Sequence, residues 1–163
     1  MMNGVASAAM RHTEDYRVNF GVELPRLQQL AHTYEPDHQL AQTLWKESVR
    51  ECRILATILQ PVTSFPTELA DVWVEQIHTA EIAQIASLNL FQRLPYASEK
   101  AFQWIASDRE IAQICGLATI FHVARRYELQ PRAAVELRDQ AESLRQSNQI
   151  ALQRLANNII SFL

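Results

Sequence analysis

Residues 19–59 read NFGVELPRLQQLAHTYEPDHQLAQTLWKESVRECRILATIL. Apolar residues recur there every three or four positions in three successive segments, and this spacing predicts three amphipathic helices near residues 24–31, 37–45 and 48–59. Pro25 stands where the first turn of a helix tolerates proline, and Asp37 is a good N-cap for the second helix. Because the linkers are short, we expect consecutive helices to lie antiparallel.

The third of these helices has an apolar stripe with charged residues beside it. We assign the stripe to Val49, Cys52, Leu55, Ala56 and Leu59. The flanks are then Arg50, Glu51 and Arg53. On this assignment the charged side chains border the buried face of the helix.

The composition of the whole chain favours an all-α fold. It has 163 residues, of which 48% are hydrophobic and 20% charged, values that are typical of one globular domain. Only three glycines and six prolines disfavour a turn-rich β fold. We predict a single helical domain over residues 1–163, with disorder in residues 1–12 and a short helix over 13–20.

The same spacing continues along the chain and predicts six more helices. They cover residues 67–77, 79–94, 96–107, 109–127, 132–146 and the segment from 147 or 148 to the C-terminus. Thr79 and Asp108 are the expected N-caps of two of them. The helix over 109–127 is apolar nearly all round and should be central. Helix pairs recur at roughly 30 to 40 residues, as in an α-solenoid, with an irregular helical bundle as the alternative.

The opening stretch also resembles a known family. The pattern FGV-x-x-P-x-L is followed by LA-x-x-LW-x-x-x-x-x-E-x-R-x-LA, and Asp71-Val-Trp73-Val comes later. This order is similar to that of the DNA alkylation repair family, the AlkD-like DNA glycosylases built from HEAT-like repeats. The resemblance covers roughly residues 19–127 and implies a right-handed α-solenoid of HEAT-like helical pairs. The residues that carry it in the first half are Phe20, Gly21, Val22, Pro25, Leu27, Ala31, Leu40, Ala41, Leu44, Trp45, Glu51, Arg53, Leu55 and Ala56.

The resemblance also implies the place of a catalytic site. Family glycosylases carry Trp-Asp-x-x-Asp at the start of the helix after Asp-x-Trp-Val, and a carboxylate there stabilises the cationic sugar of base excision. The corresponding positions here are Ala80, Glu81 and Gln84. Gln84 has no charge, and Glu81 starts from a different place on the helix surface. We therefore assign no catalytic residue, and Glu81 is the carboxylate that would act under the alternative of residual excision.

Two further family positions differ in this chain. An arginine that the resemblance places in the helix over 109–127 corresponds to Gln113 or Ile114, and a tryptophan falls near Arg154. These changes favour a catalytically degenerate homologue that binds DNA, with residual excision through an altered site as a variant of that hypothesis.

The charge balance does not favour a strong DNA binder. The net charge is −3, whereas proteins that bind DNA without sequence preference usually present a basic surface. A local group of cations remains compatible with this total. The DNA-binding candidates are Arg50, Arg53, Arg93, Lys100, Arg125 and Arg126. Arg125 and Arg126 fit equally well as solvated residues that complement a helix C-terminus.

No other site is recognisable. The five histidines are scattered without metal-ligand spacing, and Cys52 and Cys115 fall on apolar stripes, so we expect no metal, no cofactor and no disulfide. No apolar run has the length of a membrane span, and no signal peptide is visible, which predicts a cytoplasmic protein.

Two classes of partner fit these observations. Duplex DNA follows from the resemblance, and a protein or peptide on the concave face of a HEAT-like interaction scaffold is the alternative. The apolar C-terminal residues Ile159, Ile160, Phe162 and Leu163 also raise the expectation of a homo-oligomer.

Overall fold

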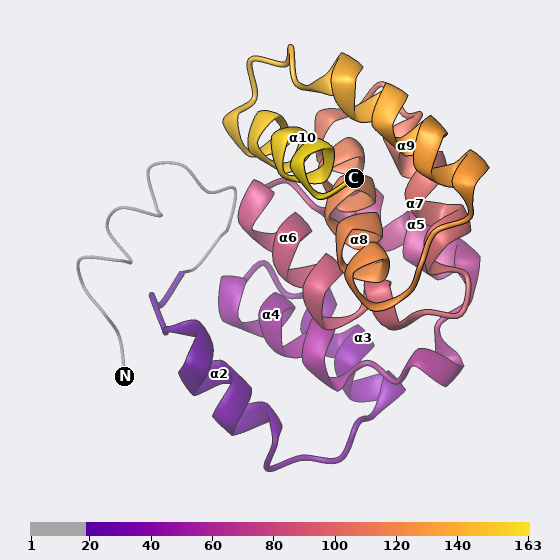
Figure 1. The fold of residues 1–163 in the computed structure, drawn as a ribbon. Coiled ribbons are helices and arrows are strands. Elements are labelled where there is room, and N and C mark those ends of the chain that lie inside the picture. The colour runs from indigo at the N-terminus through magenta and orange to yellow at the C-terminus, as the bar shows by residue number, and fades with distance from the viewer. Residues whose placement is uncertain (1–18) are drawn as a thin grey trace. The chain divides into compact units, whose positions relative to one another are not determined.

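The computed structural model describes residues 19–163, so the expected disorder over 1–12 and residues 13–18 of the expected helix over 13–20 lie outside the described residues, and Asn19 and Phe20 are not helical. Within 19–163 the regular elements are helices (Figure 1), which confirms the all-α prediction. None of these helices is both long enough and apolar enough to cross a membrane. The elements are α2 (Leu24–Ala31), α3 (His38–Lys46), α4 (Arg50–Leu59), the 3-10 helix η1 (Val62–Ser64), α5 (Thr67–Gln76), α6 (Ala80–Asn89), the 3-10 helix η2 (Phe91–Arg93), α7 (Ala97–Ile105), α8 (Glu110–Arg126), α9 (Pro131–Leu144) and α10 (Ile150–Phe162).

The chain divides into two compact units, Met1–Pro66 and Thr67–Leu163. In the first unit, α2 and α3 both pack against α4. Their shared core contains Leu27, Ala41 and Trp45, each of which is almost completely buried. The three helices agree with the three that the opening stretch predicts. The expectation of one domain over residues 1–163 stays a prediction.

Helix α8 is the centre of the second unit, as its apolar circumference predicted. It packs against α5, α6, α7 and α10, and residues 114–120 are all buried. Gly116 allows α7 to come close, because a Cβ atom at this position would lie 2.6 Å from the carbonyl oxygen of Ala101. Helices α9 and α10 form a further packed pair. Trp73 of α5 is 1% exposed and belongs to this core, as expected.

Two predicted N-caps are confirmed. The Asp37 carboxylate accepts the backbone N–H of Leu40 at 3.0 Å, and the Thr79 hydroxyl accepts that of Ile82 at 3.2 Å. Each cap satisfies a backbone donor that has no partner inside its helix.

The cap predicted for α8 is wrong. The N-cap is Arg109 rather than Asp108, and its backbone N–H donates to Oγ of Ser107 at 3.1 Å. The guanidinium of Arg109 donates to the carbonyl oxygen of Val74 at 2.7 Å and to that of Ile77. Val74 lies in the last turn of α5 and Ile77 follows this helix, so Arg109 links the start of α8 to the end of α5.

Two other helix boundaries differ from the sequence pattern. The helix expected over 79–94 ends at Asn89, because Leu90 leaves the helical conformation (φ −126°, ψ −60°) and η2 follows. Leu90 and Phe91 are completely buried, so core packing fixes the turn. The last helix begins at Ile150 after the N-cap Gln149, slightly later than expected.

Candidate functional site

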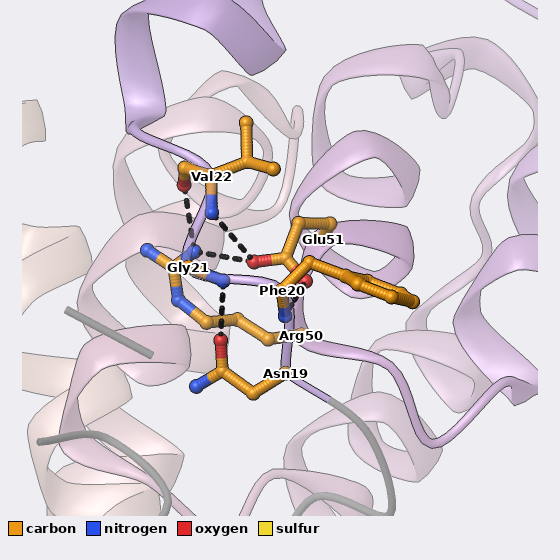
Figure 2. A network of polar contacts seen from close by, with 6 residues as sticks. All are labelled: Asn19, Phe20, Gly21, Val22, Arg50 and Glu51. Atoms are coloured by element: carbon orange, nitrogen blue, oxygen red, sulfur yellow. Dashed lines mark hydrogen bonds and ion pairs between the residues drawn. The ribbon is translucent and has the colours of Figure 1, made fainter. Parts of the chain in front are cut away.

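Arg50 and Glu51, which the sequence places on the flanks of the apolar stripe, form a buried ion pair at the start of α4 (Figure 2). The guanidinium lies 2.8 Å from the carboxylate, and each residue is 6% exposed. Glu51 accepts the backbone N–H groups of Phe20 at 3.0 Å and Val22 at 3.3 Å. Arg50 donates to the carbonyl oxygen of Val22 at 2.9 Å. Because these bonds use the charges of both side chains, Arg50 is not available to a phosphate.

Gly21 shapes the segment that this ion pair holds. Its φ is 67°, a left-handed conformation that favours glycine, and its N–H donates to Oδ1 of Asn19 at 2.8 Å. The FGV residues of the family pattern are therefore structural: they turn the chain onto α4.

Arg53 also has a contact within the first unit. Its guanidinium carbon lies 4.7 Å from the ring centroid of Trp45, which is 2% exposed. A cation over an indole ring is a favourable packing arrangement, and a phosphate would have to compete with it. Both arginine candidates of the first unit are thus in structural contacts.

The family motif position Gln84 lies at an open hollow in the second unit. This hollow has a volume of about 720 Å³ and is formed by Gln84 of α6 and by residues at the start and along one side of α10. Gln84 and Arg154, which are far apart in the sequence, both line this hollow. The other lining residues are Asn148, Gln149, Ile150, Ala151, Leu155 and Asn158.

The polar side chains of the hollow are amides and one guanidinium. Gln84 and Arg154 are exposed, and no hydrogen bond or ion pair holds either side chain within residues 19–163. Gln149 is committed to capping α10, because its Oε1 accepts the N–H groups of Ala151 at 2.6 Å and Leu152 at 3.3 Å. No carboxylate from the described part of the chain lines the hollow. It can donate hydrogen bonds and attract an anion.

The remaining family positions offer no substitute for the missing acid. Ala80 is the first residue of α6, and Glu81 is partly buried and does not line the hollow. Gln113 donates its amide to the carbonyl oxygen of Ser107 at 2.7 Å, and Ile114 is completely buried. Neither residue supplies the cation that the resemblance places on this helix.

Arg93 and Arg126 line a second pocket of the same unit. The pocket has a volume of about 340 Å³ and lies where the end of α8 meets η2 and the start of α7. Arg125 is exposed, and its guanidinium carbon lies 5.6 Å from the ring centroid of Phe121. The structure thus brings together two of the predicted DNA-binding residues and leaves Arg125 beside them on α8.

Lys100 is held by an ion pair. Its ammonium lies 2.7 Å from the carboxylate of Asp71, and its side chain is only 12% exposed. The same carboxylate accepts the indole N–H of Trp104 at 3.0 Å. Asp71, the acid of the Asp-Val-Trp-Val pattern, therefore joins α5 to α7. These partners lie 29 and 33 residues along the chain, so local spacing gave no signal for them.

The arginines at the end of α8 affect the histidine that precedes them. Burial lowers the pKa of His122, and the positive charges of Arg125 and Arg126 lower it further.

The sequence matches the model of a known family, described as DNA alkylation repair enzyme, over residues 3–159. The chain belongs to the DNA alkylation repair enzyme family. The match is longer than the expected resemblance, which covered only residues 19–127. Helices α9 and most of α10 therefore belong to the family region of this DNA alkylation repair family member, and so does Arg154.

A solved structure is similar over nearly the whole chain. It is described as "a new family of proteins related to the HEAT-like repeat DNA glycosylases with affinity for branched DNA structures". The TM-score is 0.86 at 13% sequence identity, and the match covers 97% of this chain and 68% of that one. At this identity the likeness concerns the fold, and it confirms the HEAT-like prediction. No sequence among curated proteins matches the chain.

Proposed function

We propose that this member of the DNA alkylation repair family binds DNA and does not excise bases. The observation that supports this most directly is the hollow at Gln84, which presents amides and the guanidinium of Arg154 and no carboxylate from the described residues. An anionic phosphate suits such a surface, whereas a cationic sugar does not.

Base excision passes through a sugar that carries developing positive charge, and a fixed anion beside it contributes several kcal/mol at an enclosed site. An amide at position 84 cannot supply this ion-pair interaction. The guanidinium of Arg154 in the same hollow does not replace the missing anion. The same guanidinium attracts a DNA phosphate, and amide groups can hydrogen-bond to phosphate or sugar oxygens.

Branched DNA is the first ligand to test. The similar solved structure is described as having affinity for branched DNA, and this chain shares its fold. The family name supports a role on DNA, and the cytoplasmic location expected from the sequence is part of the proposal.

The expected salt dependence is modest. Arg93, Arg126 and Arg154 line the two cationic pockets of the second unit. One phosphate at each pocket gives a slope of log K against log salt of about −2, since each neutralised phosphate contributes close to one. A net charge of −3 for the chain is consistent with such a small contact set.

The test is fluorescence anisotropy with a labelled four-way junction and a labelled duplex of equal length, in a salt series. We expect binding at low salt that weakens as salt is raised, and a smaller slope for Arg154→Gln. Arg138→Gln is the control, because Arg138 is exposed on α9 and lines neither cationic pocket. Absence of binding to both DNAs at low salt would remove the proposal.

A HEAT-like protein-interaction scaffold is the alternative function. It is favoured by an apolar groove of about 420 Å³ in the first unit, where Phe20 is 42% exposed and Leu30 is 46% exposed. Solvent-exposed apolar grooves of this kind often bind proteins or peptides. If DNA binding is absent, this groove becomes the leading candidate interface.

The homo-oligomer expected from the sequence depends on the C-terminal apolar residues. Ile159 is 1% exposed, so the expected apolar C-terminal edge is smaller than the sequence indicated. Phe162 is 49% exposed and lies edge-on to Phe121, with ring centroids 5.8 Å apart. Light scattering of the intact chain measures whether this edge forms a dimer.

A further inference from the structure

The pocket where α8 meets η2 and α7 combines two cations with an exposed aromatic ring. Arg93 of η2 and Arg126 of α8 are both exposed and line it, together with Ser98 of α7 and Tyr127. Within the described residues no carboxylate lines this pocket. Its volume of about 340 Å³ lies at the lower end of the range for small-molecule sites, roughly 300–1,000 Å³.

The guanidinium of Arg126 is already oriented in the absence of a ligand. One of its nitrogens donates to the carbonyl oxygen of Gln92 at 2.7 Å, and its central carbon lies 5.2 Å from the ring centroid of Tyr127. These contacts leave further N–H groups of the guanidinium, which has five donors in total. A positioned guanidinium loses less entropy when it binds a phosphate.

Arg93 approaches the same pocket from a different segment. No hydrogen bond, ion pair or ring contact holds its side chain within residues 19–163. A structural role as a helix C-terminal cation can account for Arg126, which ends α8. Arg93 ends η2, which has only three residues and therefore a much smaller dipole for a cation to complement.

Tyr127 is 63% exposed and follows the last residue of α8. Because so little of its surface is buried, the ring contributes little to the core. Proteins that bind unpaired DNA combine cations for the backbone with aromatic rings on which bases stack. Bases inside a duplex are stacked on each other and do not offer a free face to such a ring.

We propose that this pocket binds an unpaired nucleotide of a DNA strand, with its phosphate between Arg93 and Arg126 and its base against Tyr127. This inference rests on the proposed DNA-binding function and deepens it, because it names the strand structure that this pocket recognises. This pocket and the hollow at Gln84 share no lining residue, so the two can be tested separately.

The test measures the affinity of a labelled short oligothymidine and of a labelled blunt duplex by fluorescence anisotropy at low salt. Tyr127→Leu should weaken binding of the oligothymidine about five- to hundredfold, which is the range for loss of one base stack, and should leave duplex affinity within about twofold. Tyr127→Phe should retain the wild-type affinity for both. Arg93→Gln should also weaken oligothymidine binding. It replaces a guanidinium that makes no hydrogen bond, ion pair or ring contact within residues 19–163.

Arg138→Gln is the charge-matched control and should behave like the wild type. If the wild type binds DNA but Tyr127→Leu and Arg93→Gln bind oligothymidine equally well, this inference is wrong and the proposed function stands. Equal weakening of single-stranded and duplex binding by Tyr127→Leu also overturns it. If the wild type binds neither DNA, the proposed function fails, and this inference fails with it.

Discussion

The Arg50 guanidinium lies 2.8 Å from the carboxylate of its chain neighbour Glu51, and both side chains are buried. Adjacent residues of a helix do not normally face each other. Here they converge because the Phe20–Val22 segment supplies backbone partners to both. The family pattern at the N-terminus of the fold is thus held together by a buried ion pair.

Glu51→Gln should lower the free energy of unfolding by about 3–5 kcal/mol, because it removes the carboxylate charge that lies beside the buried Arg50 guanidinium. Urea denaturation followed by circular dichroism measures this. Glu35→Gln is the control, since Glu35 is exposed in the same unit, and it should stay within about 0.5 kcal/mol of the wild type. Equal stability of the two variants would show that the ion pair does not hold the segment.

Gly116→Ala should destabilise the second unit by about 1–3 kcal/mol, the usual cost of overpacking a core. The new Cβ atom would lie 2.6 Å from the carbonyl oxygen of Ala101 and 2.7 Å from a side-chain carbon of Ile105. Thermal unfolding measures the loss, with Ala106→Ser at an exposed position as the control. An unchanged melting temperature for Gly116→Ala would contradict the close packing of α7 on α8.

Lys100→Gln should leave DNA affinity within about twofold and should lower stability by about 1 kcal/mol, since a partly exposed ion pair contributes little more. We expect little change in DNA affinity because the ammonium of Lys100 is paired with the carboxylate of Asp71 and is not free to bind a phosphate. Anisotropy and urea denaturation on the same preparation separate the two effects. A large loss of DNA affinity without loss of stability would restore Lys100 as a DNA contact.

His122 should make stability depend on pH near neutrality. Its pKa in the folded state is lowered from the ordinary 6.5, so the unfolded chain binds more protons as the pH falls through 6.5. The free energy of unfolding should therefore decrease from pH 7.5 toward more acidic values, and His122→Gln should show a shallower decrease. His78→Gln, at an exposed position, is the control. Identical pH profiles for His122→Gln and the wild type would show that His122 is not the source of the pH dependence of stability.

Sequence reasoning succeeded where a feature depends on neighbouring residues. The caps at Asp37 and Thr79 each join positions three residues apart, and the burial of α8 follows from its own apolar residues. It failed where partners are distant. Arg109, and not the expected Asp108, is the N-cap of α8, and its guanidinium binds carbonyl oxygens more than thirty residues away.

The candidate site shows the same division. The motif position Gln84 was found from the family pattern, but the fact that Arg154 lines the same hollow was not, because 70 positions separate the two residues in the sequence. The burial of Arg50 was missed for another reason. A hydrophobicity pattern treats every charge as surface, whereas a paired charge can enter a core.

The central claim is that DNA is bound and its modified bases are left in place. The direct test is release of a methylated purine from a labelled duplex in single-turnover conditions, with wild-type protein in excess at a salt concentration where anisotropy shows the duplex to be bound. We predict that the base stays on the DNA at the uncatalysed rate for wild type and Glu81→Gln, and that Gln84→Asp is the variant in which any release appears. Rapid release by the wild type that Glu81→Gln abolishes would contradict the account.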